Sequence, residues 1–198
     1  MFDLTGKVAL VTGVGSPAGI GFASAKLLAK AGAKIFITST TDRVFEREKY
    51  LKSLFGKDKV YSLAADLTEE DQVLNLSKTI IKKFNKVDIL VNNAGMVQIG
   101  NDQPSKKFIE HSLESWNYGI DINLKSTFLV TRNILPYLKK QKSGRIINIS
   151  SVTGPIVGIS GSTVYGSAKA AMLGLTRSLA IEEGKNGITV NCVDPGWI

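Results

Sequence analysis

Apolar residues along this 198-residue chain occur in short runs that alternate with longer amphipathic segments. The runs are rich in β-branched side chains, which is typical of buried strands. The longer segments repeat apolar positions every three or four residues, which indicates helices with one face packed on a core. We predict strands at 7–12, 34–38, 59–64, 87–91, 145–149 and 188–193, helices at 19–31, 42–54, 68–84, 113–138 and 164–183, and a loop at 92–111.

The alternation of strand and helix predicts a doubly wound parallel sheet in a three-layer α/β arrangement of the Rossmann type. For such a fold we expect the strand order 3-2-1-4-5-6, with ligands bound beyond the carboxyl ends of the strands. The run at 145–149 lacks clean alternation, so we expect helices on both of its faces. No linker or repeat interrupts the chain, and residues 1–198 are predicted to form a single domain.

Three chemically active side chains gather around the end of the run at 145–149. Ser151 follows this predicted strand, and Tyr165 and Lys169 are four residues apart on the next predicted helix, so they share a face. A phenol has a reference pKa of about 10, and a nearby ammonium lowers it toward the range useful for proton transfer. A serine hydroxyl can stabilise an oxygen that gains charge. The Tyr-x-x-x-Lys spacing alone also arises by chance in many helices, so its weight depends on neighbouring motifs.

A glycine-rich stretch, TGVGSPAGIG at 12–21, follows the first predicted strand and opens a helix. Glycines allow a close approach of the backbone, and a helix N-terminus offers unpaired N–H groups to a pyrophosphate. An ordinary tight turn between strand and helix is the alternative interpretation.

Further polar residues fall at the same edge of the predicted sheet. Asp66 ends the third strand and could accept from an adenine amino group or cap the next helix. The sequence Asn-Asn-Ala-Gly at 92–95 could line a cofactor and fix nearby backbone, or form a plain turn. Asn123 interrupts an apolar helix, where its amide needs a main-chain partner or a polar relay. Pro195-Gly196 ends the sixth strand.

Together these motifs resemble the ordered set of the short-chain dehydrogenase/reductase family, most like its 3-oxoacyl-[acyl-carrier-protein] reductases, over the whole chain. The resemblance implies an oxidoreductase that moves a hydride between NAD(P)(H) and a carbonyl or alcohol carbon. It implies that Tyr165 exchanges the proton, Ser151 holds the substrate oxygen, Lys169 assists the tyrosine and binds the ribose, and Asn123 supports a proton-relay water. The expected cofactor contacts are Gly13, Gly19, Ile20, Gly21, Ser39, Thr40, Asp66, Leu67, Asn93, Ala94, Gly95, Tyr165, Lys169, Pro195, Gly196 and Ile198.

Two departures from the family pattern stand out. Five residues separate the Thr-Gly and Gly-x-Gly pairs where similar proteins have three, and Pro17 among them has no N–H to donate. The sequence therefore does not identify which backbone amides of this loop would contact a pyrophosphate. The sequence also ends at Ile198, directly after the sixth predicted strand. We expect this to be part of a longer chain, and the strand at 188–193 to lie at an open edge.

The tip of the second strand bears on the choice of cofactor. An acidic residue there would bind the ribose hydroxyl of NAD, whereas Ser39 and Thr40 occupy the tip here and Arg43 follows closely. This favours NADP(H) over NAD(H), although Asp42 is near enough for a small shift in the turn to reverse the preference. Ser39 and Thr40 could alternatively cap the following helix.

The formal net charge is +8, but no basic run is long enough for a nucleic-acid-binding arm. A basic surface can attract an anionic substrate or an acidic acyl carrier protein, or simply be solvated. The chain has no apolar run of membrane length, and its N-terminus is typical of a lead-in to a strand rather than of a signal peptide, so we expect a cytoplasmic protein that binds neither membrane nor nucleic acid. With Cys192 and His111 as the only cysteine and histidine, we expect no metal site, and His111 is predicted to be a surface loop residue.

The predicted helices at 113–138 and 164–183 are apolar on more than one side. The family resemblance implies that a second subunit covers them, in a homodimer or homotetramer. Our hypothesis is an NADPH-dependent carbonyl reductase that acts on a 3-oxoacyl thioester of fatty acid biosynthesis. The alternatives are an NAD-dependent dehydrogenase of a sugar, steroid or other small alcohol, and a cofactor-binding scaffold or sensor with little turnover.

Overall fold

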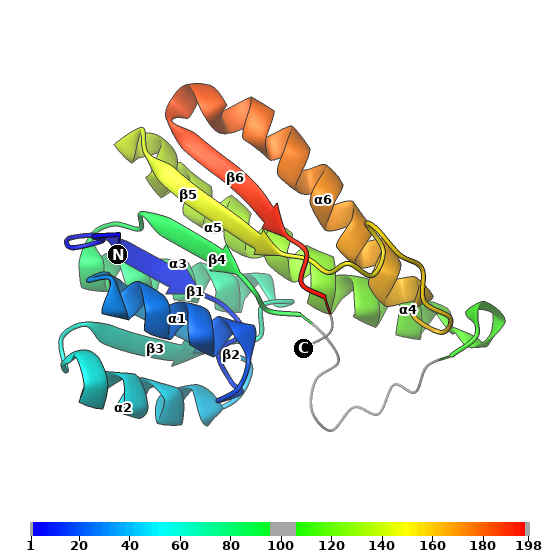
Figure 1. The fold of residues 1–198 in the computed structure, drawn as a ribbon, viewed down its shortest axis with the longest axis horizontal. Helices are drawn as coiled ribbons and strands as arrows, with labels where there is room; N and C mark the ends of the chain where they lie inside the picture. Colours follow the sequence, from blue (N-terminus) through cyan, green and yellow to red (C-terminus); the bar gives the residue numbers. More distant parts are fainter. Residues whose placement is uncertain (1, 96–105, 197–198) are drawn as a thin grey trace.

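Six parallel strands form one sheet in the order β3-β2-β1-β4-β5-β6, which confirms the predicted topology. The structure is a computed structural model that describes residues 2–95 and 106–196. All strands pair in parallel with their neighbours, so their carboxyl ends lie at one edge (Figure 1). The strands are β1 (Val8–Val11), β2 (Lys34–Ser39), β3 (Val60–Ala64), β4 (Ile89–Asn92), β5 (Gly144–Ile149) and β6 (Ile188–Val193).

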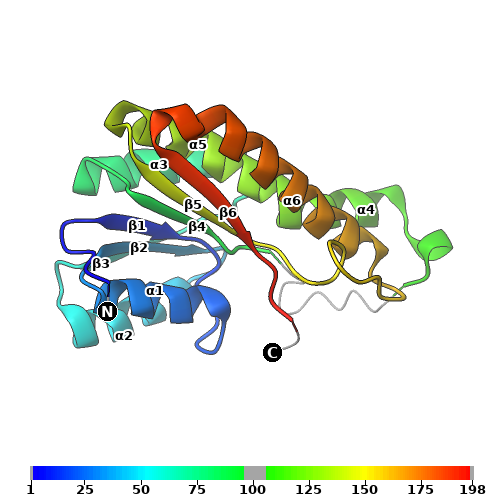
Figure 2. The same ribbon diagram turned by 45° about the horizontal axis from the view of Figure 1, so that its top comes forward.

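Helices cover the sheet in two layers, as expected for a doubly wound fold. Helices α1 and α2 pack on one face, and α3, α5 and α6 on the other (Figure 2). The helices are α1 (Ile20–Lys30), α2 (Arg43–Phe55), α3 (Glu70–Phe84), α4 (Leu113–Ile120), α5 (Ser126–Gln141) and α6 (Thr163–Glu183), with short 3-10 turns at η1 (Phe108–Glu110) and η3 (Gly184–Asn186). Among the described helices, none is long and apolar enough to cross a membrane.

The position of β1 at the centre of the sheet, with helices on both faces, explains why its sequence is continuously apolar. Ala9 and Val11 belong to the core under α1 and α2, whereas Val8 and Leu10 belong to the core under α3, α5 and α6. All four side chains are buried. A strand covered on both faces has no solvent side on which to place polar residues.

The expectation of helices on both faces of β5 is only partly correct. Ile146 is fully buried in the core under α5 and α6, but Ile147, on the opposite face, is half-buried. The neighbouring strand β6 alternates buried Ile188 and Val190 with exposed Thr189. In the described part of the chain, the helix that packs on β6 is α6, on one side, and β6 is an edge strand as predicted.

The predicted helix at 113–138 is confirmed as helical throughout, and it contains a π-helical turn. A π-helical turn, η2 (Asp121–Lys125), separates α4 from α5, and Asn123 lies at its centre. The side-chain amide of Asn123 donates to the carbonyl of Gly119 at 3.0 Å, four residues earlier. A π turn inserts one extra residue into a helix and is frequent at functional sites. The predicted helix is therefore present, and the π turn within it was not predicted because apolar periodicity does not register one additional residue.

Candidate functional site

The ends of β1 and β4 are locked together by reciprocal hydrogen bonds. The hydroxyl of Thr12 accepts from the backbone N–H groups of Asn93 and Ala94, both at 2.9 Å. The side-chain amide of Asn93 donates to the carbonyls of Thr12 at 3.0 Å and Gly13 at 3.2 Å. Thr12 and Asn93 therefore hold the glycine-rich loop against the loop after β4. Thr12 was noted as part of a motif but not as a site residue, because its partner is 81 residues away.

Two glycines of this loop are required by close approach of the chain. Gly13 has φ +71°, and a Cβ atom there would lie 2.7 Å from the side-chain nitrogen of Asn93. A Cβ atom at Gly21 would lie 2.4 Å from the same nitrogen. Gly19 is the N-cap of α1, which begins at Ile20. Any side chain at Gly13 or Gly21 would push the loop off the end of β4.

The lengthened part of the loop forms its own turn. The N–H of Ala18 donates to the hydroxyl of Ser16 at 3.3 Å, and the N–H of Gly19 donates to the carbonyl of Ser16 at 3.4 Å. These two amides are thus engaged within the loop. The N–H groups of Ala18 and Gly19 are therefore less available to a pyrophosphate than the other amides of the loop.

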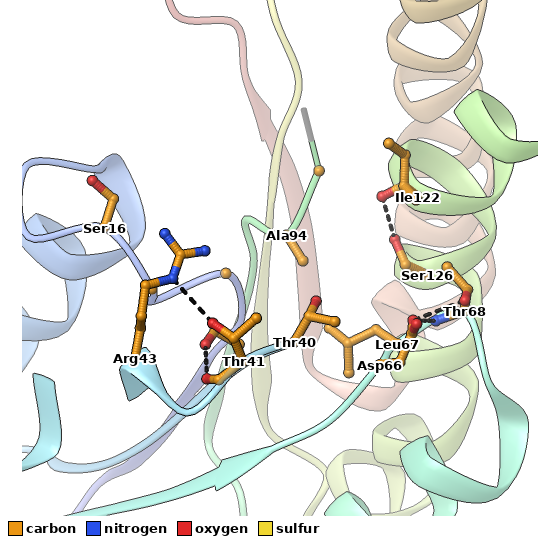
Figure 3. Close-up of a pocket in the computed structure, with 14 residues that line it drawn as sticks. Ser16, Thr40, Thr41, Arg43, Asp66, Leu67, Thr68, Ala94, Ile122 and Ser126 are labelled. Atoms are coloured by element: carbon orange, nitrogen blue, oxygen red, sulfur yellow. Dashed lines mark hydrogen bonds between the residues drawn. The ribbon is translucent and has the colours of Figure 1, made fainter. Parts of the chain in front are cut away.

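An open cleft lies at the carboxyl ends of β1 to β4, bounded by the glycine-rich loop on one side and η2 and α5 on the other (Figure 3). In Figure 3, Ser16 and Arg43 lie on one side of the cleft, Ile122 and Ser126 on the other, and Ala94 between them. Its lining comprises Gly13, Gly15, Ser16, Ser39, Thr40, Thr41, Arg43, Asp66, Leu67, Thr68, Ala94, Gly95, Ile122 and Ser126. Many of the expected cofactor contacts therefore share one cleft.

Asp66 shapes the turn between β3 and α3. One of its carboxylate oxygens, Oδ1, accepts from the N–H of Thr68 at 2.9 Å and from its hydroxyl at 2.8 Å. The N-cap of α3 is Glu69, so Asp66 holds the preceding turn rather than capping the helix itself. Leu67 is buried beneath this turn.

The tip of β2 presents hydroxyls and a guanidinium to the cleft. The hydroxyl of Ser39 donates to the carbonyl of Thr41 at 2.8 Å, and Nε of Arg43 donates to the Thr41 hydroxyl at 3.0 Å. Helix α2 has Asp42 as its N-cap and no side-chain capping bond, so the alternative that Ser39 and Thr40 cap it was wrong. Arg43 lines the cleft, whereas Asp42 is not among its lining residues.

A second cluster, centred on the Lys169 ammonium, is buried. Lys169 is 2% exposed, and its Nζ donates to the carbonyl of Ile149 at 2.9 Å. Burial lowers the pKa of Lys169 to about 8. The ammonium lies 5.6 Å from the centroid of the Tyr165 ring. A Cβ atom on Gly95 would lie 3.3 Å from this ammonium and 2.9 Å from the side-chain oxygen of Asn123, so η2, the loop after β4 and α6 meet here.

Ser151 lies on a loop that contacts α6 on both sides of it. Just before it, the hydroxyl of Ser150 donates to the Lys169 carbonyl at 2.9 Å. Just after it, Gly154 has φ +104°, and a Cβ atom there would lie 2.1 Å from the carbonyl oxygen of Gly166. These two contacts attach the Ser151 loop to the turn of α6 that carries Tyr165. Sequence reasoning did not identify Ser150, because its hydrogen-bond partner is set by the packing of α6.

The end of β6 supports the same loop. The carbonyl of Pro195 accepts from the N–H of Val152 at 3.0 Å, and the hydroxyl of Ser151 accepts from the N–H of Thr153 at 3.1 Å. Gly196 follows with open space around it. Ile198, an expected cofactor contact, lies outside the described residues.

The lone histidine is not a fully exposed loop residue. His111 is half-buried, and its Nδ1 lies 3.2 Å from the hydroxyl of Ser115. Residues 2–95 and 106–196 contain no group of three or more His, Cys, Asp or Glu side chains that could hold a metal ion. Burial raises the pKa of the Cys192 thiol, which keeps this thiol protonated near neutral pH.

Comparison with known proteins places these features in a family. The model of the family described as short chain dehydrogenase matches residues 7–198. The chain is 38% identical to the oxidoreductase UcpA of Salmonella typhimurium, over all of this chain and 72% of that protein. It is 36% identical to the 3-oxoacyl-[acyl-carrier-protein] reductase FabG of Thermotoga maritima, over 98% of this chain and 75% of that protein.

Solved structures agree with the sequence comparisons. A short chain dehydrogenase from Mycobacterium smegmatis superposes with a TM-score of 0.89 at 29% identity. The match covers 99% of this chain and 80% of that chain. The two chains therefore share their fold over nearly all of the residues compared.

Proposed function

Because the chain belongs to the short-chain dehydrogenase family and is an NAD(P)-dependent oxidoreductase, we propose a specific reaction for it. The protein reduces a carbonyl group to a hydroxyl with NADPH. The observation that carries the proposal is the buried Lys169 ammonium, which lies beside Tyr165 and faces Gly95 and Asn123. A buried cation with a lowered pKa next to a phenol is an arrangement suited to proton transfer.

The open cleft fits a dinucleotide. It lies at the carboxyl ends of the central strands, and Gly13 and Gly21 keep the loop low where a side chain would collide. Asp66, Leu67 and the backbone at 93–95 would hold the adenosine, with Ser39 and Thr40 toward its ribose. The glycine-rich loop and the N-terminus of α1 would hold the pyrophosphate, through the N–H of Ile20 rather than that of Gly19, which is engaged with Ser16. Tyr165, Lys169 and the segment Pro195-Gly196 would hold the nicotinamide half, which supplies the hydride when bound.

The chain's own residues would manage the proton and the developing charge. The Tyr165 phenol donates a proton to the carbonyl oxygen, and the Ser151 hydroxyl donates a hydrogen bond to the same oxygen. The Lys169 ammonium, still mostly protonated at pH 7 because its pKa is about 8, favours the phenolate left behind. Asn123, fixed in the π turn beside Lys169, would support a water that relays the proton back.

The preference for NADPH over NADH rests on Arg43. Its guanidinium borders the cleft close to Ser39 and Thr41, and a Cβ atom on Gly15 would lie only 3.6 Å from its Nη2. A guanidinium favours a 2′-phosphate, and Asp66 is the one carboxylate among the described lining residues.

The substrate class is proposed from the relatives. Proteins named 3-oxoacyl-[acyl-carrier-protein] reductase match the chain at 36–39% identity over nearly its whole length. The net charge of +8 would suit an acidic acyl carrier protein. We therefore propose a 3-oxoacyl thioester as the substrate.

A nicotinamide assay tests the proposal. The full-length protein is mixed with NADPH or NADH and a panel of 3-oxoacyl thioesters, sugars and steroids, and the loss of reduced nicotinamide is followed. We expect NADPH-dependent turnover of the thioesters, which Tyr165→Phe lowers by about 10²–10⁴-fold. Turnover that survives this substitution would exclude Tyr165 as the proton donor.

Other outcomes select the alternatives. Oxidation of a sugar or steroid alcohol with NAD would indicate a dehydrogenase of small alcohols. Tight binding of the cofactor without turnover on any substrate would indicate a scaffold or sensor.

We also propose that α4, α5 and α6 pack against a second copy of the chain. These helices expose large apolar side chains, with Leu113 74% exposed, Phe128 45% and Ile181 85%. Sedimentation of the full-length protein should show a dimer or tetramer, and a monomer at micromolar concentration would contradict this.

A further inference from the structure

Two buried asparagines face each other on neighbouring strands beneath the site. Asn92 on β4 is 2% exposed and Asn148 on β5 is 1% exposed, and the two residues are paired in the sheet register. The side-chain amide of Asn92 donates to the hydroxyl of Thr131 on α5 and to the side-chain oxygen of Asn148, both at 2.9 Å. The amide of Asn148 donates to the hydroxyl of Thr176 on α6, also at 2.9 Å. A polar row thus runs from α5 through two strands to α6.

The hydrogen bonds of this row have one direction. Because Asn92 donates to the side-chain oxygen of Asn148, the NH₂ group of Asn148 must face α6. The Thr176 hydroxyl accepts from this NH₂ group and donates in turn to the carbonyl of Met172 at 2.8 Å. The side-chain oxygen of Asn92 is buried and has no partner in the described part of the chain. An apolar core would avoid such an unsatisfied oxygen, so packing alone does not account for the row.

Three contacts attach α6 to β5 and to the loop that follows β5. Gly166 meets Gly154, the Lys169 carbonyl accepts from Ser150, and Thr176 accepts from Asn148. From the N-terminus of α6 toward its C-terminus, the partner residues have decreasing sequence numbers: Gly154, Ser150 and then Asn148 on β5. Thr176 lies seven residues beyond Lys169, about 10 Å along the helix, and therefore does not reach the reacting atoms.

We propose that Asn148 and Thr176 are positioning residues, which set the register of α6 on β5 and thereby place Tyr165 and Lys169. This inference rests on the proposed function for its catalytic consequence. The apolar contacts of α6, from residues such as Ala168 and Met172, are non-directional and would tolerate a small slide. A buried amide tolerates none, because only one register brings the Thr176 hydroxyl within reach of Asn148.

The chain offers a matched pair of substitutions. Thr176→Val and Thr131→Val each remove, without changing shape, one hydroxyl that accepts from a strand asparagine, and both threonines are 5% exposed. In the full-length protein we expect Thr176→Val to lower kcat for thioester reduction by about tenfold or more, with Kd for NADPH changed less than about twofold. Thr131→Val should lower the thermal stability by about as much as Thr176→Val does, and its kcat should stay within about twofold of the wild-type value. Thr176→Ser, which retains the hydroxyl, should restore kcat.

Amide hydrogen exchange of residues 163–172 supplies a readout that does not need turnover. Exchange should accelerate in Thr176→Val and not in Thr131→Val; if Thr176→Val does not fold, Thr176→Cys replaces the hydroxyl by a weaker acceptor and also removes the γ-methyl group. Equal kcat losses in the two valine variants, or equal exchange, would overturn the positioning role while leaving the reductase in place. A wild-type protein that folds and turns over no substrate would overturn the proposed function, and the exchange comparison would still decide the register.

Discussion

The cleft at the strand ends and the Lys169 cluster are built by opposite means. The cleft depends on backbone and on missing side chains: Gly13 and Gly21 allow the loop to approach Asn93, and part of the lining, at Thr40, Thr41 and Arg43, is exposed. The cluster depends on buried polar side chains, with Lys169 2% and Asn123 3% exposed, each bonded to a backbone carbonyl.

This difference follows from what each region must do. An open cleft admits a large ligand, but it buries little surface, so the free energy that stabilises the fold comes from other parts of the molecule. A buried cation costs stability, because burial disfavours its charge. We therefore expect substitutions at the closely approached glycines of the cleft to weaken binding and stability together, and substitutions in the cluster to separate stability from activity.

Lys169→Met should separate them most strongly. The fall of the Lys169 pKa from 10.5 to about 8 corresponds to roughly 3 kcal/mol of lost stability at neutral pH. Removing the charge should raise the free energy of unfolding at pH 7 by about 1–3 kcal/mol, since the lost bond to Ile149 offsets part of the gain. Turnover should fall by about 10²–10⁴-fold. Chemical denaturation and the nicotinamide assay measure the two effects, and a destabilised Lys169→Met protein would contradict the contrast.

The pH dependence of this gain has a definite sign. Below about pH 8, folding buries a charged ammonium; between about 8 and 10.5, the folded protein has lost a proton that the unfolded chain keeps. Wild-type stability from Lys169 therefore rises with pH across this window, and the advantage of Lys169→Met shrinks. Denaturation of both proteins at pH 7 and pH 10 tests this, and a constant gap would be inconsistent with a lowered pKa.

Gly21→Ala tests the cleft. The new Cβ atom would lie 2.4 Å from the Asn93 side chain and 2.8 Å from the Gly13 carbonyl, so we expect a loss of about 1–3 kcal/mol in unfolding free energy and weaker cofactor binding. Gly174→Ala is the control, because Gly174 lies within α6 with nothing within 4 Å of its Cβ position. It should stabilise the protein by about 0.5–1 kcal/mol. If Gly21→Ala and Gly174→Ala destabilise the protein to a similar extent, the close approach of Gly21 to Asn93 is not the cause of the loss.

Arg43→Ala should have the smallest and most selective effect. We expect it to weaken NADPH binding by about tenfold, since a charge-assisted contact to the 2′-phosphate is lost in an exposed setting. NADH serves as the matched ligand, and its Kd should not change. Fluorescence titration with both cofactors measures this, and equal weakening would assign Arg43 to the shared part of the ligand.

The strand order and nearly all element boundaries could be predicted from local patterns, because a doubly wound fold repeats one unit of strand and helix. The grouping of Gly13, Asp66 and Ala94 at one cleft followed from the rule that parallel strands end at the same edge. The predictions missed the π turn around Asn123, where one additional residue changes the geometry of a correctly predicted helix, and they erred where coverage depends on distant chain, as at Ile147.

Local sequence thus predicted which residue types stand at the carboxyl ends of the strands, because every strand of a parallel sheet ends at the same edge, whatever its place in the order 3-2-1-4-5-6. The partners of Thr12, Ser150 and Asn148 could not be predicted in this way, since each bonds to a residue 19 to 82 positions away. Such partners are chosen by how the helices settle on the sheet. The buried surroundings that lower the pKa of Lys169 arise only from that packing.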